Sequence, residues 1–432
     1  MDLSQRQLVA IAHPPSLAAD HFASACSLPN VVYAGFDPTS DSLHVGNLLV
    51  LSSLLRALRH GCRGIALIGG ATALIGDPSG RDTERLEMAE EVVRENTREL
   101  RKQIERIVQN FYEKYSSEAM QPMELVDNAE WHSKMSSLEF MRICRLFRVG
   151  DMLRLGAIKS RMRENRGLPC SEFLYQVMQS YDWYQLSQKY DCYFQIGGSD
   201  QLGHLDAGYD YIRLRTGRLS AGICLPLITD SGGNKLGKSV TNPKENVWLS
   251  ESKTSPYALY QFFRQQPDKE IVPLMRYLSL LPMSDVNNIL VEHAANLGKW
   301  IAQEALAKEM TQLVHGSNGL DLALQCSRAL FEGSLSDIEK LPLSTLEHLF
   351  GEASIRRISK SEVSTVGDIA DRTRSDKMRG SILMRKGALA LNGQKFTNPD
   401  EAIDFEKILL ARKNATLVCW GKRKYQLIRW AD

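Results

Sequence analysis

The stretch VVYAGFDPTSDSLHVGN, residues 31–47, indicates the fold of the N-terminal part of the chain. Its apolar start, residues 31–37, predicts a buried parallel strand, and the turn residues PTSDS follow. The next segment has helical periodicity and stops at Gly61, and a second apolar run spans residues 65–70. Strand, helix and strand within about 40 residues form a βαβ unit, so we expect a parallel sheet with a right-handed crossover.

The rest of the chain predicts further helices and strands. A Ser/Lys-rich stretch, residues 356–364, predicts a linker, and the tail from Thr365 mixes two short helices with strands. Ser171 is a candidate N-cap. The other expected elements are a charged amphipathic helix over residues 88–115, a helix over 171–190, a strand over 192–201, a helix over 205–216, a strand over 224–229 and mostly helical structure over 255–349.

Composition indicates a globular protein of two to four domains. The 432 residues are 43% hydrophobic with a mean hydropathy of −0.26, and no apolar run approaches the roughly 18 residues of a membrane helix. The eight cysteines lie at least 22 residues apart, so we expect reduced thiols and no zinc site. The first 20 residues contain one arginine and no apolar signal segment, which is not typical of a targeting sequence.

Charge is distributed unevenly along the chain. Residues 351–432 contain 17 Lys and Arg against 10 Asp and Glu, a net charge of +7. The whole chain carries +2, so residues 1–350 carry −5. A basic C-terminal block on an acidic body favours a polyanionic partner for the tail. The tail aromatics Trp420, Tyr425 and Trp430 suit either a core or a stacking surface, and their alternation within expected strands favours the core.

Polar side chains follow the expected strands at the sheet edge where nucleotides bind in open α/β folds. His44 and Asn47 lie at a helix start, where phosphate is favoured, and Asp77 follows the second strand. The motif QIGGSDQ, residues 195–201, brings two glycines and several polar groups to the same edge. Taken singly, each segment also suits an ordinary helix start or turn.

Two further segments carry candidate ligand-binding groups. On the helix from residue 171, Tyr175, Gln179 and Asp182 share one face amid bulky apolar residues. Such a stripe suits either a bound polar ligand or a solvated helix edge. The loop SGGNKLGKS, residues 231–239, places Lys235 and Lys238 three residues apart, which suits either a triphosphate or a solvated surface loop.

Together, these motifs resemble a known enzyme family. His44-Val-Gly-Asn47 and Lys235-Leu-Gly-Lys238-Ser239 look like the HIGH and KMSKS signatures of class I aminoacyl-tRNA synthetases. The segments YAGFDPTSDSLHVGN, GDPSGR, QIGGSDQ and VWLSESKTSPYALYQFF resemble tyrosyl-tRNA synthetases of the bacterial and mitochondrial type, and KLGKS favours the mitochondrial branch. Two positions depart from the family: Asn47 replaces the second histidine of HIGH, and His204 stands where asparagine is common.

The resemblance implies a role for each matching residue. Tyr33, Asp77, Tyr175, Gln179, Asp182 and Gln195 would bind tyrosine. Asp37, Thr39, His44, Gly46, Asn47, Gly198, Asp200, Gln201, Lys235, Lys238 and Ser239 would bind ATP, which enters with Mg²⁺ as its substrate complex. Catalysis would consist of positioning and of charge stabilisation by His44, Asn47, Lys235 and Lys238, with no tightly bound protein metal.

The resemblance also implies a domain order and partners. We expect a Rossmann-like α/β catalytic domain over residues 1–229, the signature loop and linker over 230–254, a helical anticodon-binding domain over 255–350 and a small α+β S4-like tRNA-binding domain over 351–432. The implied partners are tRNA(Tyr), L-tyrosine, ATP and a second copy of the chain bound through residues 127–167, in the mitochondrial matrix or a bacterial cytoplasm, without a membrane. The alternatives are a tryptophanyl-tRNA synthetase, a tRNA-independent nucleotidyltransferase and an RNA-binding factor without catalysis.

Overall fold

The computed structural model describes most of the chain, in two compact units. One unit comprises Met1–Leu236 with Asp268–Ala302, and the other comprises Gly237–Pro267 with Gln303–Asp432. Among the described residues, no helix is both long and apolar enough to span a membrane. The described residues are 2–15, 30–79, 84–116, 120–154, 156–163, 167–227, 246–331, 338, 343–350, 354–374, 380–410, 413–421 and 424–431.

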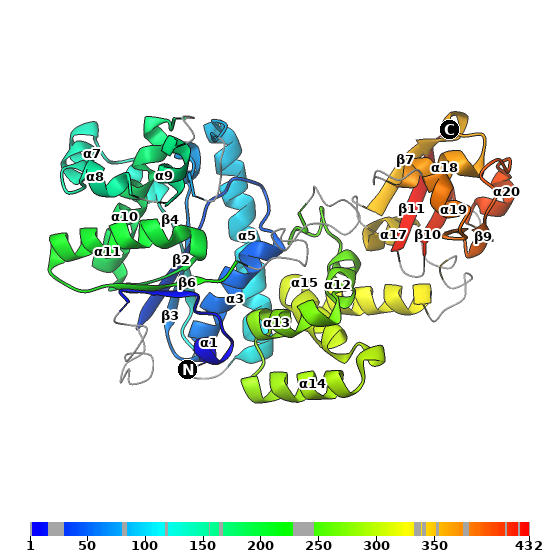
Figure 1. Cartoon of the computed structure of the whole chain (residues 1–432), viewed down its shortest axis with the longest axis horizontal. Coiled ribbons are helices and arrows are strands. Elements are labelled where there is room, and N and C mark those ends of the chain that lie inside the picture. The colour runs from blue at the N-terminus through cyan, green and yellow to red at the C-terminus, as the bar shows by residue number, and fades with distance from the viewer. Residues whose placement is uncertain are drawn as a thin grey trace. The chain divides into compact units, whose positions relative to one another are not determined.

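The first unit contains a six-stranded sheet with the order β1-β6-β5-β2-β3-β4 (Figure 1). β1 pairs antiparallel with β6, and the other pairings are parallel. The chain runs from β2 to β3 on one side and returns to β5 on the other, so the strand order reverses between β2 and β5. Ligand crevices of open α/β sheets lie at such a reversal. The strands are β1 (Ile11–His13), β2 (Val31–Phe36), β3 (Arg63–Ile68), β4 (Met123–Asp127), β5 (Phe194–Gly198) and β6 (Ala221–Leu225).

Helices cover both faces of this sheet (Figure 1). On one face lie α3 (Val45–Arg59) and α5 (Glu90–Tyr115), and on the other lie α10 (Cys170–Tyr190) and α11 (Leu202–Thr216). The expected βαβ unit is confirmed as β2, α3 and β3, and the chain leaves α3 through Gly61 at a φ of +85°. On the α10 face, Tyr33 packs in the core with Trp183 and Leu205.

Two groups of helices complete the first unit. Between β4 and α10 lie α6 (Ala129–His132), α7 (Ser137–Cys144), α8 (Val149–Met152) and α9 (Gly156–Arg163). The later segment forms α13 (Asp268–Leu278) and α14 (Met283–Ala295). It is bound to the sheet region because Arg6 and Arg56 donate hydrogen bonds of 2.9 and 2.8 Å to the carbonyl oxygen of Ser279.

The second unit combines helices with a five-stranded sheet of order β7-β11-β10-β8-β9. Trp420 and Trp430 lie buried in the core of that sheet, which confirms the expected core role of these two residues. Its main elements are α12 (Pro256–Arg264), α15 (Ile301–Phe331), α17 (Leu343–Phe350), β7 (Ile355–Ser359), α18 (Val366–Thr373), α19 (Gly380–Met384), β8 (Leu389–Leu391), β9 (Gln394–Phe396), α20 (Phe405–Ile408), β10 (Ala415–Trp420) and β11 (Lys424–Ala431).

Several local predictions were wrong. Ser171 does not cap its helix, because α10 already begins at Cys170 after the N-cap Pro169. The stretch expected to be a linker contributes β7, which pairs in parallel with β11 and therefore belongs to the sheet. The strand expected at residues 224–229 is β6 and lies earlier, at Ala221–Leu225, while residues 228–229 fall outside the described part of the chain.

Candidate active site

A cavity of about 410 Å³ lies at the carboxyl ends of β2 and β5, where the strand order reverses. It brings together polar residues that are far apart in the sequence. Lys235, Lys238 and Ser239 lie outside the residues that the structure describes. The other residues predicted for tyrosine or ATP binding all line the cavity: Tyr33, Asp37, Thr39, His44, Gly46, Asn47, Asp77, Tyr175, Gln179, Asp182, Gln195, Gly198, Asp200 and Gln201.

Three lining side chains present buried polar atoms that are not hydrogen-bonded to any residue that the structure describes. Tyr33 and Gln195 are neighbours in the parallel register of β2 and β5. The Tyr33 hydroxyl and the Oε1 atoms of Gln179 and Gln195 have no hydrogen-bond partner among the described residues. Burial raises the pKa of Tyr33 well above its usual value, so this hydroxyl remains protonated and able to donate. Buried polar groups normally have partners, so this cavity suits a polar ligand.

Asp182 faces the same cavity from α10 and is held by three side chains. Its Oδ1 accepts a hydrogen bond of 2.7 Å from Trp131 Nε1 and lies 2.7 Å from His132 Nε2. Its Oδ2 accepts a bond of 3.0 Å from Asn128 Nδ2. The Asp182 side chain is only 3% exposed. A buried carboxylate fixed by several donors is positioned to accept a further hydrogen bond from a ligand.

Asp37 follows β2 directly and links two walls of the cavity. Its Oδ1 accepts a hydrogen bond of 2.8 Å from Thr72 Oγ1, and its Oδ2 accepts one of 2.8 Å from the Tyr175 hydroxyl. Burial raises the pKa of Asp37 to about 6, although these two bonds oppose the shift. A Cβ atom on Gly69 would overlap Asp37 Oδ1, so only glycine leaves space for the carboxylate.

Asp77 is a carboxylate whose hydrogen bonds favour its ionised form, which can bind a cation. Ser79 donates from its backbone N–H (2.8 Å) and its hydroxyl (2.6 Å), and Gln201 Nε2 donates at 2.8 Å. His204 Nε2 lies 3.0 Å from Asp77 Oδ1. Burial raises the pKa of Asp77, but His204 and the Ser79 hydrogen bonds outweigh it and hold the pKa below its ordinary value. Asp77 therefore stays ionised near neutral pH and can bind an ammonium group.

His44 and Asn47 form a reciprocal cap at the start of α3. The backbone N–H of Asn47 donates to His44 Nδ1 at 3.3 Å, and the backbone N–H of His44 donates to Asn47 Oδ1 at 3.0 Å. This is a capping box, in which the asparagine oxygen accepts from the backbone. Because the oxygen of Asn47 is engaged, its NH₂ group is the end that can donate to a ligand at the positive end of the helix.

Several lining residues were not predicted from the sequence. Asn128 binds Asp182 and also donates to Thr72 Oγ1 at 3.0 Å. Arg85 donates from Nε to the carbonyl oxygen of Asp77 at 2.9 Å. Asn128 directly follows β4, so the rule that polar residues after a strand face the ligand edge would have found it, had that strand been recognised.

The cavity combines three groups of different chemistry. They are the ionised Asp77, the helix start at His44 and the Tyr33 hydroxyl, which has no partner among the described residues. These groups suit an ammonium, a phosphate and a hydroxyl, respectively.

Comparison with known proteins defines the class. The family model "tRNA synthetases class I (W and Y)" matches residues 27–332, and the chain belongs to that family. Enzymes of this family use ATP as a substrate. The fold agrees, since the mitochondrial tyrosyl-tRNA synthetase of Aspergillus nidulans, solved in a C-terminally truncated form, superimposes with a TM-score of 0.68. The two share 29% identity, over 76% of this chain and 93% of that one.

Proteins of similar sequence show to which group within this family the chain belongs. The mitochondrial tyrosine–tRNA ligase of Rattus norvegicus is 39% identical over 93% of this chain and 85% of its own length, and that of Homo sapiens is 38% identical over 94% and 85%. Tyrosine–tRNA ligase 1 of Vibrio parahaemolyticus is 36% identical over 98% of each chain. Within the class I synthetases, the chain therefore belongs to the tyrosine–tRNA ligases.

Proposed function

We propose that the chain activates L-tyrosine with MgATP and transfers the tyrosyl group to the 3′ end of tRNA(Tyr). The observation that carries this proposal is the pair formed by Tyr33 and Asp182. The Tyr33 hydroxyl is a buried donor that has no partner in the described part of the chain, and Asp182 is a buried, fixed acceptor on the same cavity. A substrate phenol would accept from one and donate to the other. Phenylalanine would leave the Tyr33 hydroxyl without a ligand acceptor and one acceptor position of Asp182 unfilled, and rejection of that analogue is the established behaviour of this enzyme family.

The remainder of the amino acid would lie against the Asp77 side of the cavity. Asp77 supplies a carboxylate that stays ionised, and it is the main partner proposed for the α-ammonium. Tyr175 and Gln179 from α10 line the same cavity and would complete the ammonium site. Gln195 would contact the bound tyrosine through its unpartnered Oε1.

ATP would occupy the end of the cavity at the start of α3. His44 and Asn47, at the positive end of the helix, would hold the phosphates. Gly46 and Gly198 leave room for the nucleotide to approach the backbone. The residues proposed to contact the nucleotide are Asp37, Thr39, His44, Gly46, Asn47, Gly198, Asp200 and Gln201 within the described cavity, and Lys235, Lys238 and Ser239 on the signature loop.

The chemistry would need no protein nucleophile. An oxygen of the tyrosine carboxylate attacks the α-phosphorus of MgATP, a new C–O–P linkage forms, and the bond to pyrophosphate breaks. A ribose hydroxyl at the end of the tRNA then attacks the carbonyl carbon, and AMP leaves. The protein would contribute positioning and would stabilise the phosphate charge through His44, Asn47, Lys235 and Lys238. Mg²⁺ would enter bound to ATP.

We also propose the wider setting of the reaction. The basic tail, residues 351–432 with a net charge of +7, would bind tRNA phosphates as an S4-like domain, and residues 255–350 would contain the anticodon-binding region. A second copy would pack on residues 127–167, where Leu138, Met141, Val149 and Met162 are exposed by 52–70%. The mitochondrial ligases among the relatives support a location in the mitochondrial matrix.

Tyrosine-dependent exchange of labelled pyrophosphate into ATP tests the amino-acid specificity. We expect exchange with tyrosine and little with tryptophan or phenylalanine. Asp182→Ala should lose tyrosine-dependent exchange, because the acceptor for the phenol is removed. Exchange that responds to tryptophan, or an unchanged KM for tyrosine in Asp182→Ala, would refute the proposed site.

A further inference from the structure

We infer that His132 is a positioning residue that acts through Asp182 to leave a single acceptor site for the substrate hydroxyl. The inference rests on the proposed function and deepens it. His132 ends the short helix α6, and its Nε2 lies 2.7 Å from Asp182 Oδ1. Their side chains are 7% and 3% exposed, so water does not compete with the contact. His132 does not line the substrate cavity and would reach the substrate only through Asp182.

Counting hydrogen bonds shows what His132 adds. An ionised carboxylate has about four acceptor positions, two on each oxygen. The indole of Trp131 can only donate, and it occupies one position on Oδ1 at 2.7 Å. His132 occupies the second position on Oδ1 at 2.7 Å, and Asn128 occupies one on Oδ2 at 3.0 Å. One position on Oδ2 remains, and it suits one hydroxyl donor.

The same count of hydrogen bonds also indicates which group donates in the contact between His132 and Asp182. Asp182 accepts from Trp131 and Asn128 and is therefore an acceptor in this arrangement. Since Asp182 accepts at its other two contacts, we take Nε2 of His132 to donate its hydrogen to Oδ1 at 2.7 Å. His132 thus holds Asp182 as the acceptor that a phenol requires.

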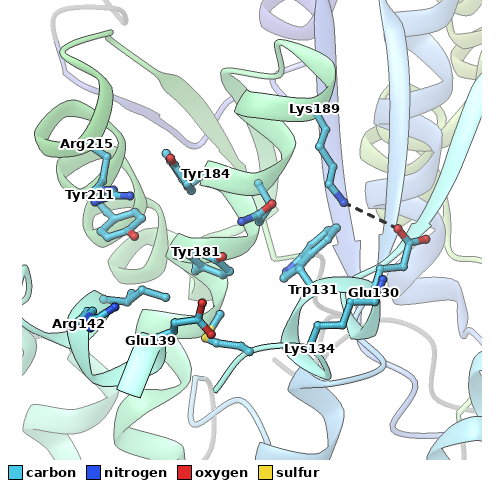
Figure 2. Close-up of a pocket in the computed structure, with 13 residues that line it drawn as sticks. Glu130, Trp131, Lys134, Glu139, Arg142, Tyr181, Tyr184, Lys189, Tyr211 and Arg215 are labelled. Carbon is cyan, nitrogen blue, oxygen red and sulfur yellow. Dashed lines mark ion pairs between the residues drawn. The ribbon is translucent and has the colours of Figure 1, made fainter. Parts of the chain in front are cut away.

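The rings of His132 and Trp131, which contact Asp182, also pack against other side chains. The His132 ring lies 5.8 Å from the Tyr181 ring and 6.3 Å from the Trp131 ring, measured between centroids. Figure 2 shows Trp131 and Tyr181 among the side chains that line a second cavity of about 590 Å³. Lys189 lies 5.0 Å from the centre of the Trp131 ring and 4.0 Å from Glu130. Trp131 and His132, two of the groups that hold Asp182, are therefore themselves in contact with further side chains.

Substitutions in the full-length protein test the inference. His132→Leu removes the donor. His132→Asn keeps a polar side chain but places its amide nitrogen one bond too short to reach Oδ1. His132→Gln places an amide nitrogen the same number of bonds from Cα as Nε2. His60→Gln, at a histidine whose side chain is 54% exposed, is a control remote from the cavity.

The readout is kcat and KM for tyrosine, phenylalanine and ATP in pyrophosphate exchange, together with the melting temperature. We expect His132→Leu and His132→Asn to raise KM for tyrosine and to lower the preference for tyrosine over phenylalanine, each about tenfold, with KM for ATP unchanged. A tenfold change corresponds to about 1.4 kcal/mol. In His132→Gln, the KM for tyrosine and the preference for tyrosine over phenylalanine should both lie close to those of the unsubstituted protein.

Two kinds of result would overturn the inference. Equal kinetics in His132→Asn, His132→Gln and the unsubstituted protein would show that the donor is not used. A loss that affects ATP and tyrosine equally, with a lowered melting temperature in all three variants, would show a purely structural role. Failure of the proposed function would look different, since the unsubstituted protein itself would lack tyrosine-dependent exchange.

Discussion

Tyr175 donates a hydrogen bond of 2.8 Å from its hydroxyl to Oδ2 of Asp37. The bond joins the end of β2 to helix α10, across the sheet edge where the cavity lies. It also joins a residue proposed to bind ATP to one proposed to bind tyrosine. The two halves of the proposed site are therefore in direct contact, and a change in the charge of Asp37 would reach both.

The raised pKa of Asp37 predicts how stability changes with pH. Burial raises this pKa to about 6 in the folded chain, from the ordinary value of 3.8. A carboxyl group with a raised pKa contributes stability below its unfolded value, and this contribution is lost as the pH rises through the folded value. Relative to Asp37→Asn, the free energy of unfolding should therefore fall between about pH 4 and pH 6, by up to about 3 kcal/mol, and then remain level.

Urea unfolding of both proteins at about pH 4.5, 5.5, 6.5 and 7.5 checks this prediction. The difference between the two free energies should follow one titration centred between the two pKa values. A difference that stays constant over this range would contradict it.

Tyr33→Phe should separate stability from function. The hydroxyl is buried and has no partner among the residues described, so its removal should leave the free energy of unfolding unchanged or raise it by about 1 kcal/mol. Tyrosine-dependent kcat/KM should nevertheless fall about tenfold, because the substrate phenol loses a donor. Urea unfolding and pyrophosphate exchange measure the two effects. A less stable variant with unchanged use of tyrosine would show that the hydroxyl serves the fold.

Arg56 should contribute to the free energy of unfolding because its side chain is buried and hydrogen-bonds to backbone carbonyl groups. It is 2% exposed and donates to Ser279 O at 2.8 Å and to Tyr277 O, so Arg56→Ala leaves buried carbonyl groups short of a donor. We expect a loss of about 2–4 kcal/mol in the free energy of unfolding. Arg63→Ala is the matched control, since its ion pair with Glu124 is 38–44% exposed and should contribute less than about 1 kcal/mol. Equal effects in the two variants would argue against this role for Arg56.

The sequence allowed prediction of those elements whose signals are local. The strand at residues 31–36 and the helix after it carry an apolar run, a periodic stripe and a glycine stop, and each is visible within a few residues. The cap at Ser171 was misplaced because Pro169, two residues earlier, is the N-cap and the helix begins at Cys170. β7 was missed because its strand character depends on pairing with β11, about 70 residues later, and its central Arg356 and Arg357 are typical of a linker.

The residues of the candidate site also divide into those that the local sequence reveals and those that it does not. Residues next to strand ends, such as Asp37 and Asp77, could be found from their position alone. His132 could not, because its partner Asp182 lies 50 residues away and nothing in the local sequence indicates the contact. The unpartnered Tyr33 hydroxyl is likewise visible only once its surroundings are known.

Lys235 and Lys238 should act on adenylation rather than on tyrosine binding. Both are cations on a glycine-rich segment, which suits charge stabilisation of the triphosphate during transfer. Lys235→Ala and Lys238→Ala, made separately, should slow the single-turnover rate of adenylate formation by about 10-fold or more and change the Kd for tyrosine by less than about twofold. Stopped-flow fluorescence and equilibrium dialysis measure the two quantities. Equal losses in both would indicate a structural loop.

The most direct measurement is the charging of tRNA(Tyr) by the purified full-length chain with labelled tyrosine and MgATP. We expect ATP-dependent formation of tyrosyl-tRNA and no comparable charging of tRNA(Trp) with tryptophan. Asp182→Ala should abolish the product. Charging with tryptophan, or no tyrosyl-tRNA from a folded protein that binds ATP, would show that the proposed activity is wrong.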